Sequence, residues 1–234
     1  MTESTVSKNS DSEAVLKVQN LVKEVTSPEG KLTILSDVSF SVSPGEVVAL
    51  VGPSGAGKTT LLALLAGLDR PTSGDVTLCG ESLTALTEDG RAELRGRNVG
   101  FVFQSFHLVD SLTALENVML PLELSESADA AGRARKALDS VGLGSRVGHY
   151  PRQLSGGEKQ RVAIARAFVA SPAVLFADEP TGNLDSASGE RVIDLLFDLN
   201  RQSGTTLVLV THDKDLAARC GRVLEMSAGQ LVSQ

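Results

Sequence analysis

The chain has 234 residues, 41% of them hydrophobic, which is enough for one large domain or two small ones with a sizeable core and excludes a wholly disordered protein. Acidic residues outnumber basic ones by 29 to 22, giving a net charge of -7. This balance excludes nucleic-acid binding as the main activity, because phosphate neutralisation requires a basic surface. The two cysteines, Cys79 and Cys220, are too few for a disulfide framework or a zinc site, so we interpret them as buried thiols.

No run of the sequence approaches the roughly 18 apolar residues that a membrane-spanning helix needs. Residues 1–14 lack the basic start and the apolar centre of a signal peptide, so we expect them to form a flexible polar tail. One folded domain is then predicted over residues 15–234. We expect a cytoplasmic chain that reaches a membrane only through a partner.

Four apolar runs contain no alternation of polar with apolar residues, which is typical of strands buried on both faces of a parallel sheet. Helical patterns lie between these runs, so the sequence predicts an α/β fold. The predicted strands are Val47–Val51, Val99–Phe103, Val174–Ala177 and Leu207–Val210. The predicted helices are Lys58–Ala66, Ala130–Val141, Gly157–Ala170, Ser188–Arg201 and Lys214–Cys220.

Two regions depart from this alternation of strands and helices. Near the N-terminus, Leu16–Val22, Leu32–Phe40 and Gly74–Leu78 alternate polar with apolar residues and are joined by turns containing Pro or Gly. They predict a small antiparallel β-layer beside the parallel sheet. Between about residues 106 and 154 the strand signal disappears, and helical patterns over Leu112–Leu120 and Ala128–Val141 predict an inserted helical subdomain.

Residues 52–59, GPSGAGKT, fit the phosphate-loop pattern G-x-x-x-x-G-K-[ST] and lie between a predicted strand and a predicted helix. Glycines let backbone N–H groups turn inward around phosphates, and the helix N-terminus adds positive potential. Lys58, also a candidate catalytic residue, would contact the β- and γ-phosphates, and the Thr59 hydroxyl would ligate Mg²⁺. The alternative is a glycine-rich turn without a ligand. The predicted nucleotide-binding residues here are Gly52, Pro53, Ser54, Gly55, Ala56, Gly57, Lys58, Thr59 and Thr60.

Two carboxylates, Asp178 and Glu179, directly follow the predicted strand Val174–Ala177. The carboxyl ends of parallel strands face one crevice, so these side chains are expected near the phosphate loop. Asp178 is placed to hold Mg²⁺, and Glu179 to polarise a water for attack on the γ-phosphate. The alternative is that both residues only cap the turn before Pro180.

Residues 154–161 read LSGGEKQR, in which Ser155 and Glu158 form a capping-box pattern at the start of a helix. A capped helix is the plain interpretation. However, Gly156 and Gly157 leave bare N–H groups at the helix N-terminus, which is a second anion site. One nucleotide has a single γ-phosphate, so two such sites in one chain indicate that each nucleotide is held between two chains.

With these motifs in place, the sequence from about Val15 to Val232 resembles the ATP-binding subunits of ABC transporters. Residues 154–160 are similar to the signature motif of that family. Gln104 resembles its Q-loop glutamine, Asn183–Asp185 its D-loop, and His212 its switch histidine.

The resemblance implies a P-loop NTPase (RecA-like) core, ATP hydrolysis with Mg²⁺, and a head-to-tail homodimer with two ATP molecules at its interface. Each ATP would lie between the phosphate loop of one chain and Ser155, Gly156 and Gly157 of the other. The resemblance also implies that Gln104 contacts ATP and the metal, and that His212 acts with Glu179 in catalysis.

Within the family, Gly100–Gln104, Leu115–Val118 and Phe176–Asp185 resemble the lipoprotein-releasing and macrolide-exporting branch. This implies a separate integral membrane permease, held at the cytoplasmic face of the plasma membrane, which exports or extracts hydrophobic or lipid-linked molecules. Two alternatives remain: a soluble ABC ATPase outside transport, and a regulatory nucleotide-binding module without turnover, against which Glu179 argues.

One position departs from the family pattern. An aromatic residue usually precedes the phosphate loop and stacks on adenine, whereas Val25 occupies the matching place here. The resemblance therefore predicts adenine held by apolar contact and weakly discriminated from other bases. His107 and His149 match no motif and are expected on the surface, and Arg91, Arg95 and Arg97 are expected to form a solvated face.

Overall fold

The computed structural model describes residues 14–27 and 30–233, so residues 1–13 of the expected tail lie outside the described part. The strands are β1 (Leu16–Ser27), β2 (Gly30–Val42), β3 (Val47–Val51), β4 (Ser73–Leu78), β5 (Glu81–Ser82), β6 (Val99–Phe103), β7 (Val174–Asp178), β8 (Thr206–Val210), β9 (Arg222–Ser227) and β10 (Gln230–Ser233). The helices are α1 (Lys58–Leu65), α2 (Glu88–Asn98), α3 (Ala114–Leu124), α4 (Ala130–Ser140), α5 (Gly156–Phe168), α6 (Ser186–Ser203) and α7 (Lys214–Ala218), with 3-10 turns at Gly144–Arg146 and Pro151–Gln153.

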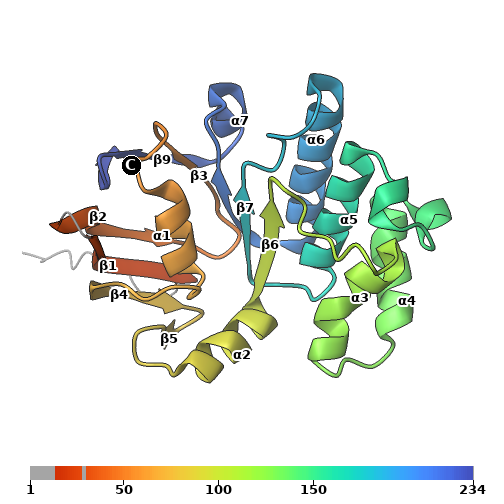
Figure 1. Ribbon diagram of the computed structural model, residues 1–234, viewed down its shortest axis with the longest axis horizontal. Coiled ribbons are helices and arrows are strands. Elements are labelled where there is room, and N and C mark those ends of the chain that lie inside the picture. The colour runs from red at the N-terminus through yellow and green to blue at the C-terminus, as the bar shows by residue number, and fades with distance from the viewer. Residues whose placement is uncertain (1–13, 28–29, 234) are drawn as a thin grey trace, which may run out of the picture.

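Two sheets make up the framework (Figure 1). Among the described residues, the main sheet has the order β10-β9-β3-β8-β7-β6, in which all neighbours are parallel except β10 and β9. The second sheet, β2-β1-β4-β5, is antiparallel and lies beside α1. The predicted α/β fold with an N-terminal antiparallel layer is confirmed.

The central strands are apolar throughout because each of their faces meets a different core. Every residue of β8 is buried. Val208 and Val210 pack in the core shared with α1 and the antiparallel layer, whereas Leu207 and Leu209 pack in the core shared with α3, α5 and α6. Side chains alternate between the faces of a strand, so a strand covered on both sides must be apolar at every position.

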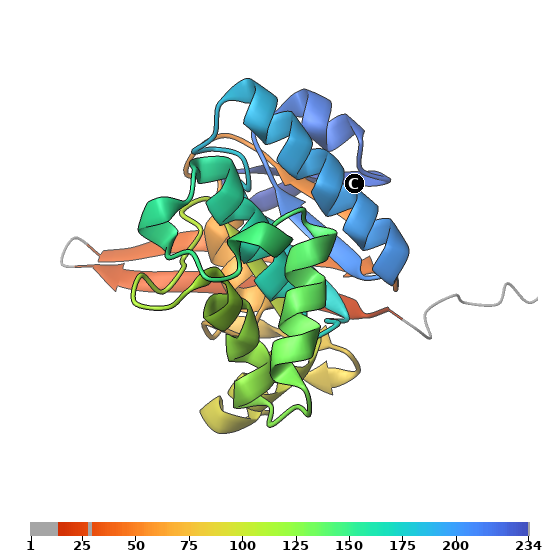
Figure 2. The ribbon, with the colours of Figure 1, turned by 90° about the vertical axis from the view of Figure 1, so that its right-hand side faces the viewer.

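The helical region lies to one side of the main sheet (Figures 1 and 2). Between residues 106 and 154, all of them described, α3 and α4 form and no strand does. Thr113 and Glu116 make a capping box at the start of α3: the hydroxyl accepts the Glu116 N–H, and the carboxylate accepts the Thr113 N–H. Among the described residues, no helix is both long and apolar enough to cross a membrane.

The sequence did not predict α2, whose residues are mostly polar. Thr87 caps this helix, and its buried face carries Arg91 and Leu94. Arg91 is only 2% exposed; it pairs with Glu88 and donates to the carbonyl of Leu86. The predicted solvated arginine face is therefore wrong for Arg91, because its long stem fills the space under α2. The side chain of Arg95 is also largely covered, and Arg97 is exposed.

The prediction of buried cysteines is also corrected. Both thiols are free and only partly buried. The apolar surroundings nevertheless raise the pKa of Cys220 to about 11 and raise the pKa of Cys79 as well. Of the two histidines expected on the surface, His107 is exposed and His149 is half-buried. The sequence also missed the hairpin β9–β10.

Candidate active site

The phosphate-loop segment links the end of β3 to the start of α1. Gly57, the N-cap residue of α1, has a left-handed backbone with φ 94°, which glycine adopts readily. The Lys58 ammonium donates to the carbonyls of Gly52 and Pro53 at 2.8 and 3.0 Å, so it lies over the loop. Every predicted residue of the loop except Ala56, which is buried, lines one hollow of about 540 Å³.

The hairpin β9–β10 packs against the phosphate-loop segment. A Cβ added to Gly52 would lie 2.2 Å from the Met226 carbonyl oxygen, so only glycine fits there. The Gly229 N–H donates to the Ala56 carbonyl at 3.2 Å. The sequence analysis missed this support, although the Ser-Ala-Gly turn at residues 227–229 is a hairpin signal.

The ends of β7 and β8 bring two more predicted residues to the hollow. The Glu179 N–H donates to the Val210 carbonyl at 3.0 Å, and Glu179 has a left-handed backbone with φ 46°. Nδ1 of His212 lies 2.9 Å from Oε1 of Glu179. This hydrogen bond, together with the negative charge of Glu179, raises the pKa of His212 above its ordinary value.

Asp178 shares the hollow with Lys58 and Thr59. Burial raises the pKa of the Asp178 carboxyl, and the neighbouring Glu179 raises it further, while Lys58 lowers it. Adjacent carboxylates in a partly buried site favour a divalent cation, and Mg²⁺ prefers oxygen ligands such as the Thr59 hydroxyl and the Asp178 carboxylate. The donor set of this hollow therefore fits magnesium.

The signature segment lies elsewhere on the chain. At the start of α5, the Ser155 hydroxyl accepts the Glu158 N–H at 3.2 Å, and the Glu158 carboxylate accepts the Ser155 N–H at 2.8 Å, as the capping-box pattern predicts. Ser155 and Gly157 line a separate hollow with Ser188 and Arg191. The single chain does not bring these residues into the phosphate-loop hollow.

Gln104, predicted to contact nucleotide and metal, follows β6 but does not line the phosphate-loop hollow. Its Nε2 donates to Oδ1 of Asn183 at 3.3 Å, and Nδ2 of Asn183 donates to the Gln104 carbonyl at 3.0 Å. The structure thus pairs Gln104 with Asn183 through two hydrogen bonds. The sequence carried no signal for this pairing, because the two residues are far apart along the chain.

Val25 and two residues of β2, Leu32 and Ile34, make up an apolar strip of the β1–β2 pair that reaches the phosphate-loop hollow at Ile34. Val25 pairs directly with Leu32, so their side chains share a face, and Ile34 lies at a register shift of the same strand pair. Val25 is 39% exposed and Leu32 56%, while Ile34 lines the phosphate-loop hollow. Leu32 and Ile34 were missed by the sequence analysis.

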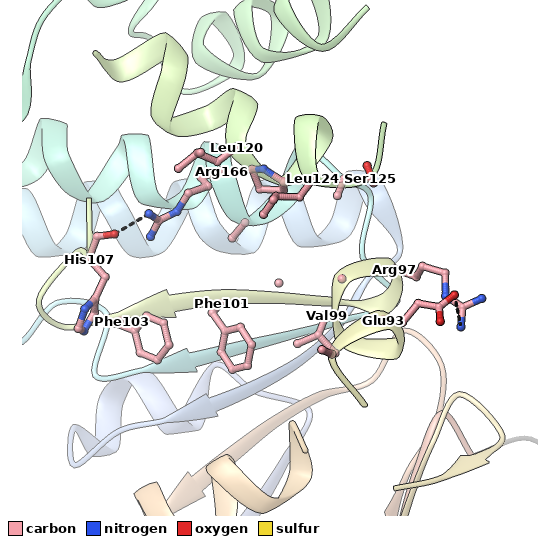
Figure 3. A pocket seen from close by; sticks show the side chains of 16 residues that line it. Glu93, Arg97, Val99, Phe101, Phe103, His107, Leu120, Leu124, Ser125 and Arg166 are labelled. Carbon is pink, nitrogen blue, oxygen red and sulfur yellow. Dashed lines mark hydrogen bonds and ion pairs between the residues drawn. The ribbon is translucent and has the colours of Figure 1, made fainter. Parts of the chain in front are cut away.

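A second, more apolar groove of about 590 Å³ lies between β6 and helices α2, α3 and α5 (Figure 3). The rings of Phe101 and Phe103 stack at 5.3 Å on one side of β6, Leu120 and Arg166 lie on the other side, and Leu124, at the end of α3, is 86% exposed. Arg166, on α5, donates to the carbonyls of Phe106 and His107 at 2.9 and 2.6 Å. Among residues 14–27 and 30–233 no carboxylate forms an ion pair with Arg166.

The profile of the ABC transporter family matches residues 35–182, well over half of the chain. The chain belongs to the ABC transporter family. Two relatives extend this match to nearly the whole chain. The ABC ATPase is 55% identical to the ABC transporter ATP-binding protein YbbA of Escherichia coli K12 over 94% of its own length and 97% of the relative. It is 50% identical to the lipoprotein-releasing system ATP-binding protein LolD of Xanthomonas euvesicatoria, over 93% and 90% of the two chains.

Solved structures agree with these sequence relatives. The ABC ATPase resembles the ATP-binding cassette MJ0796, solved as a dimer in a post-hydrolysis state with ADP and Pi, with a TM-score of 0.86 and 39% identity. The likeness covers 93% of this chain and 97% of the other. Together with the family match, it identifies the chain as an ATPase with the P-loop NTPase fold.

We expect the His212 ring to titrate above its ordinary pKa of about 6.5, because Glu179 stabilises the protonated imidazole. The Glu179→Gln variant should return the midpoint toward about 6.5. The shift stabilises the folded chain below the ordinary pKa, and this contribution is lost as pH rises through the raised value. It is small, since the His212 side chain is 76% exposed.

The measurement is an NMR titration of the histidine ring protons in the nucleotide-free protein. The chain has three histidines, so the His212→Gln variant assigns the signal. An unchanged midpoint in Glu179→Gln would contradict the assigned cause of the shift.

Proposed function

We propose that this ABC ATPase is the motor subunit of a transport complex and binds and hydrolyses MgATP in the phosphate-loop hollow. The observation that carries the proposal is the convergence of Lys58, Thr59, Asp178, Glu179 and His212 on one hollow. A phosphate-facing lysine, oxygen donors for a cation, and a carboxylate paired with a histidine are the parts that phosphoryl transfer to water requires.

Each group has a distinct role in this proposal. The backbone N–H groups of residues 52–59 and the Lys58 ammonium bind phosphate oxygens. Thr59, Asp178 and Gln104 hold magnesium, which, when bound, neutralises charge on the β- and γ-phosphates. Glu179 accepts a proton from the attacking water, and His212, hydrogen-bonded to Glu179, orients that carboxylate.

Adenine rests on the apolar strip of Val25, Leu32 and Ile34.

Two copies of the chain are proposed to complete each site. Ser155 and Gly157 line a hollow of their own, so their N–H groups are available to a nucleotide held by another chain. The resemblance to the dimeric cassette MJ0796 supports a head-to-tail homodimer. Each nucleotide would then lie between the phosphate loop of one copy and Ser155–Gly157 of the other.

The apolar groove beside β6 is proposed to hold a cytoplasmic segment of an integral membrane permease. Stacked phenylalanines and the exposed Leu124 favour apolar side chains, and Arg166, which forms no ion pair with a carboxylate in the described part of the chain, favours a carboxylate. The relative LolD, from a lipoprotein-releasing system, supports extraction or export of hydrophobic or lipid-linked molecules. In this proposal the chain is cytoplasmic and peripheral to the membrane, attached through the permease.

Replacing the general base tests the ATPase mechanism. Glu179→Gln should bind ATP normally, but its turnover should fall by about 10²-fold or more, because the amide cannot accept the proton of water. Steady-state phosphate release and ATP binding are the measurements, with Glu123→Gln, an exposed glutamate on α3, as the matched control. Near-normal turnover by Glu179→Gln would remove Glu179 from this role.

A cross-link tests the shared site. In a chain with Cys79 and Cys220 replaced by alanine, Ser54→Cys and Ser155→Cys together should form covalent dimers when MgATP is added to the Glu179→Gln form. The two serines line separate hollows within one chain, so the bond joins two copies. Either cysteine alone is the control, and failure to cross-link under binding conditions contradicts the proposed dimer.

Capture of the membrane permease tests the proposal that the permease docks in the apolar groove beside β6. The wild-type chain should retain one integral membrane protein from detergent-solubilised membranes, whereas Leu124→Arg should lose it, because a charge enters an apolar contact. Leu68→Arg, at an exposed leucine outside the groove, is the matched control. Equal capture by Leu124→Arg would place docking elsewhere, and no membrane protein in any sample would favour an ABC ATPase outside transport.

A further inference from the structure

The side chain of Gln104 packs between Asn183 and Gly182. Its Nε2 donates to Oδ1 of Asn183 at 3.3 Å, and Nδ2 of Asn183 donates to the backbone carbonyl of Gln104 at 3.0 Å. On another side, a Cβ added to Gly182 would lie 2.6 Å from Nε2 and 2.9 Å from Cδ of Gln104. The absence of a side chain at residue 182 therefore makes room for the amide beside Asn183.

The backbone segments that carry this pair are themselves tied together. Gln160, fully buried on α5, donates through Nε2 to the Phe103 carbonyl at 3.3 Å and to the Pro180 carbonyl at 2.7 Å. Phe103 directly precedes Gln104, and Pro180 lies three residues before Asn183. Because Gln160 fixes the separation of the two backbones, a rotation of the Gln104 side chain suffices to break its bond to Asn183.

We propose that Asn183 is a positioning residue that holds Gln104 away from the magnesium site until nucleotide and metal bind. The inference rests on the proposed function, in which Gln104 is a metal ligand. In this structure Gln104 lies outside the hollow that Thr59 and Asp178 line, and its Nε2 donates to Asn183, so bringing the amide oxygen into the hollow as a metal ligand requires the side chain to leave Asn183. Metal binding must then compete with that hydrogen bond.

The pair also lies directly beneath the signature segment. A Cβ added to Gly156 would meet Leu184 Cδ2 at 3.2 Å and the Asn183 carbonyl oxygen at 3.9 Å. In the proposed dimer the signature segment faces the nucleotide of the second chain. Gly156 therefore lies close to the backbone of Asn183, and movement of the signature segment gives the second chain a physical route to release Gln104.

Two variants break the restraint while leaving Gln104 intact. Asn183→Ala removes the acceptor, and Gly182→Ala pushes the amide away from it without touching Asn183. Gly182 has no left-handed backbone, so alanine fits there without backbone strain. Loss of one ordinary hydrogen bond changes an equilibrium by about two- to tenfold. Both variants should therefore lower, by about two- to tenfold, the free Mg²⁺ concentration that half-maximally tightens binding of adenylyl imidodiphosphate, a non-hydrolysable ATP analogue.

Isothermal titration calorimetry on the full chain measures this midpoint. Affinity in EDTA should be the same in all variants, and Asn183→Ala should have no further effect in a Gln104→Ala background. Asn98→Ala, which removes a side-chain bond at the end of α2, is the matched control. Thermal unfolding checks that each variant is folded.

Three results would overturn the proposal. A higher Mg²⁺ midpoint in Asn183→Ala would mean that Asn183 orients a bound Gln104 rather than restraining it. An unchanged midpoint in both variants would mean that the hydrogen bond does not restrain Gln104. A shift that persists in the Gln104→Ala background would mean that Asn183 acts by another route. By contrast, a wild-type chain that never binds the analogue would contradict the proposed function itself.

Discussion

The parallel pairing of β3, β8 and β7 is the constraint on which the rest of the structure depends. Val210 lies in register with Leu50 on one side and with Asp178 on the other. The loops that follow these three strands therefore begin at the same level of the sheet, as is general for parallel strands. This register alone brings the phosphate loop, the carboxylates and His212 to one hollow, although they come from distant parts of the sequence.

The set of charged side chains in the phosphate-loop hollow follows from the convergence of the loops after β3, β7 and β8. Lys58 is the cation of the phosphate loop, while Asp178 and Glu179 bring two carboxylates to its edge. Burial and mutual repulsion raise the pKa of Asp178, and Glu179 raises the pKa of His212 by accepting its hydrogen bond. Groups whose pKa values are shifted by specific neighbours in one cleft are suited to proton transfer and metal binding.

A single helix, α5, connects the other features. Its N-terminus carries the signature residues, and its buried Gln160 ties the end of β6 to the turn after β7. Six residues further along α5, Arg166 donates to the carbonyls of Phe106 and His107, both of which have left-handed backbones. Helix α5 thus fixes the loop after β6 at one edge of the apolar groove. The same helix therefore supports both the apolar groove and the phosphate-loop hollow.

The sequence by itself determined the parts that depend on local backbone requirements. Apolar runs gave the bounds of β3 and β6 as they occur, and glycine spacing located the phosphate loop. The tertiary structure decided what depends on distant contacts: the burial of Arg91, the pairing of Gln104 with Asn183, and the support of Gly52 by Met226. A motif records which backbone a segment can adopt, whereas the direction of a long polar side chain is set by partners that only folding brings near.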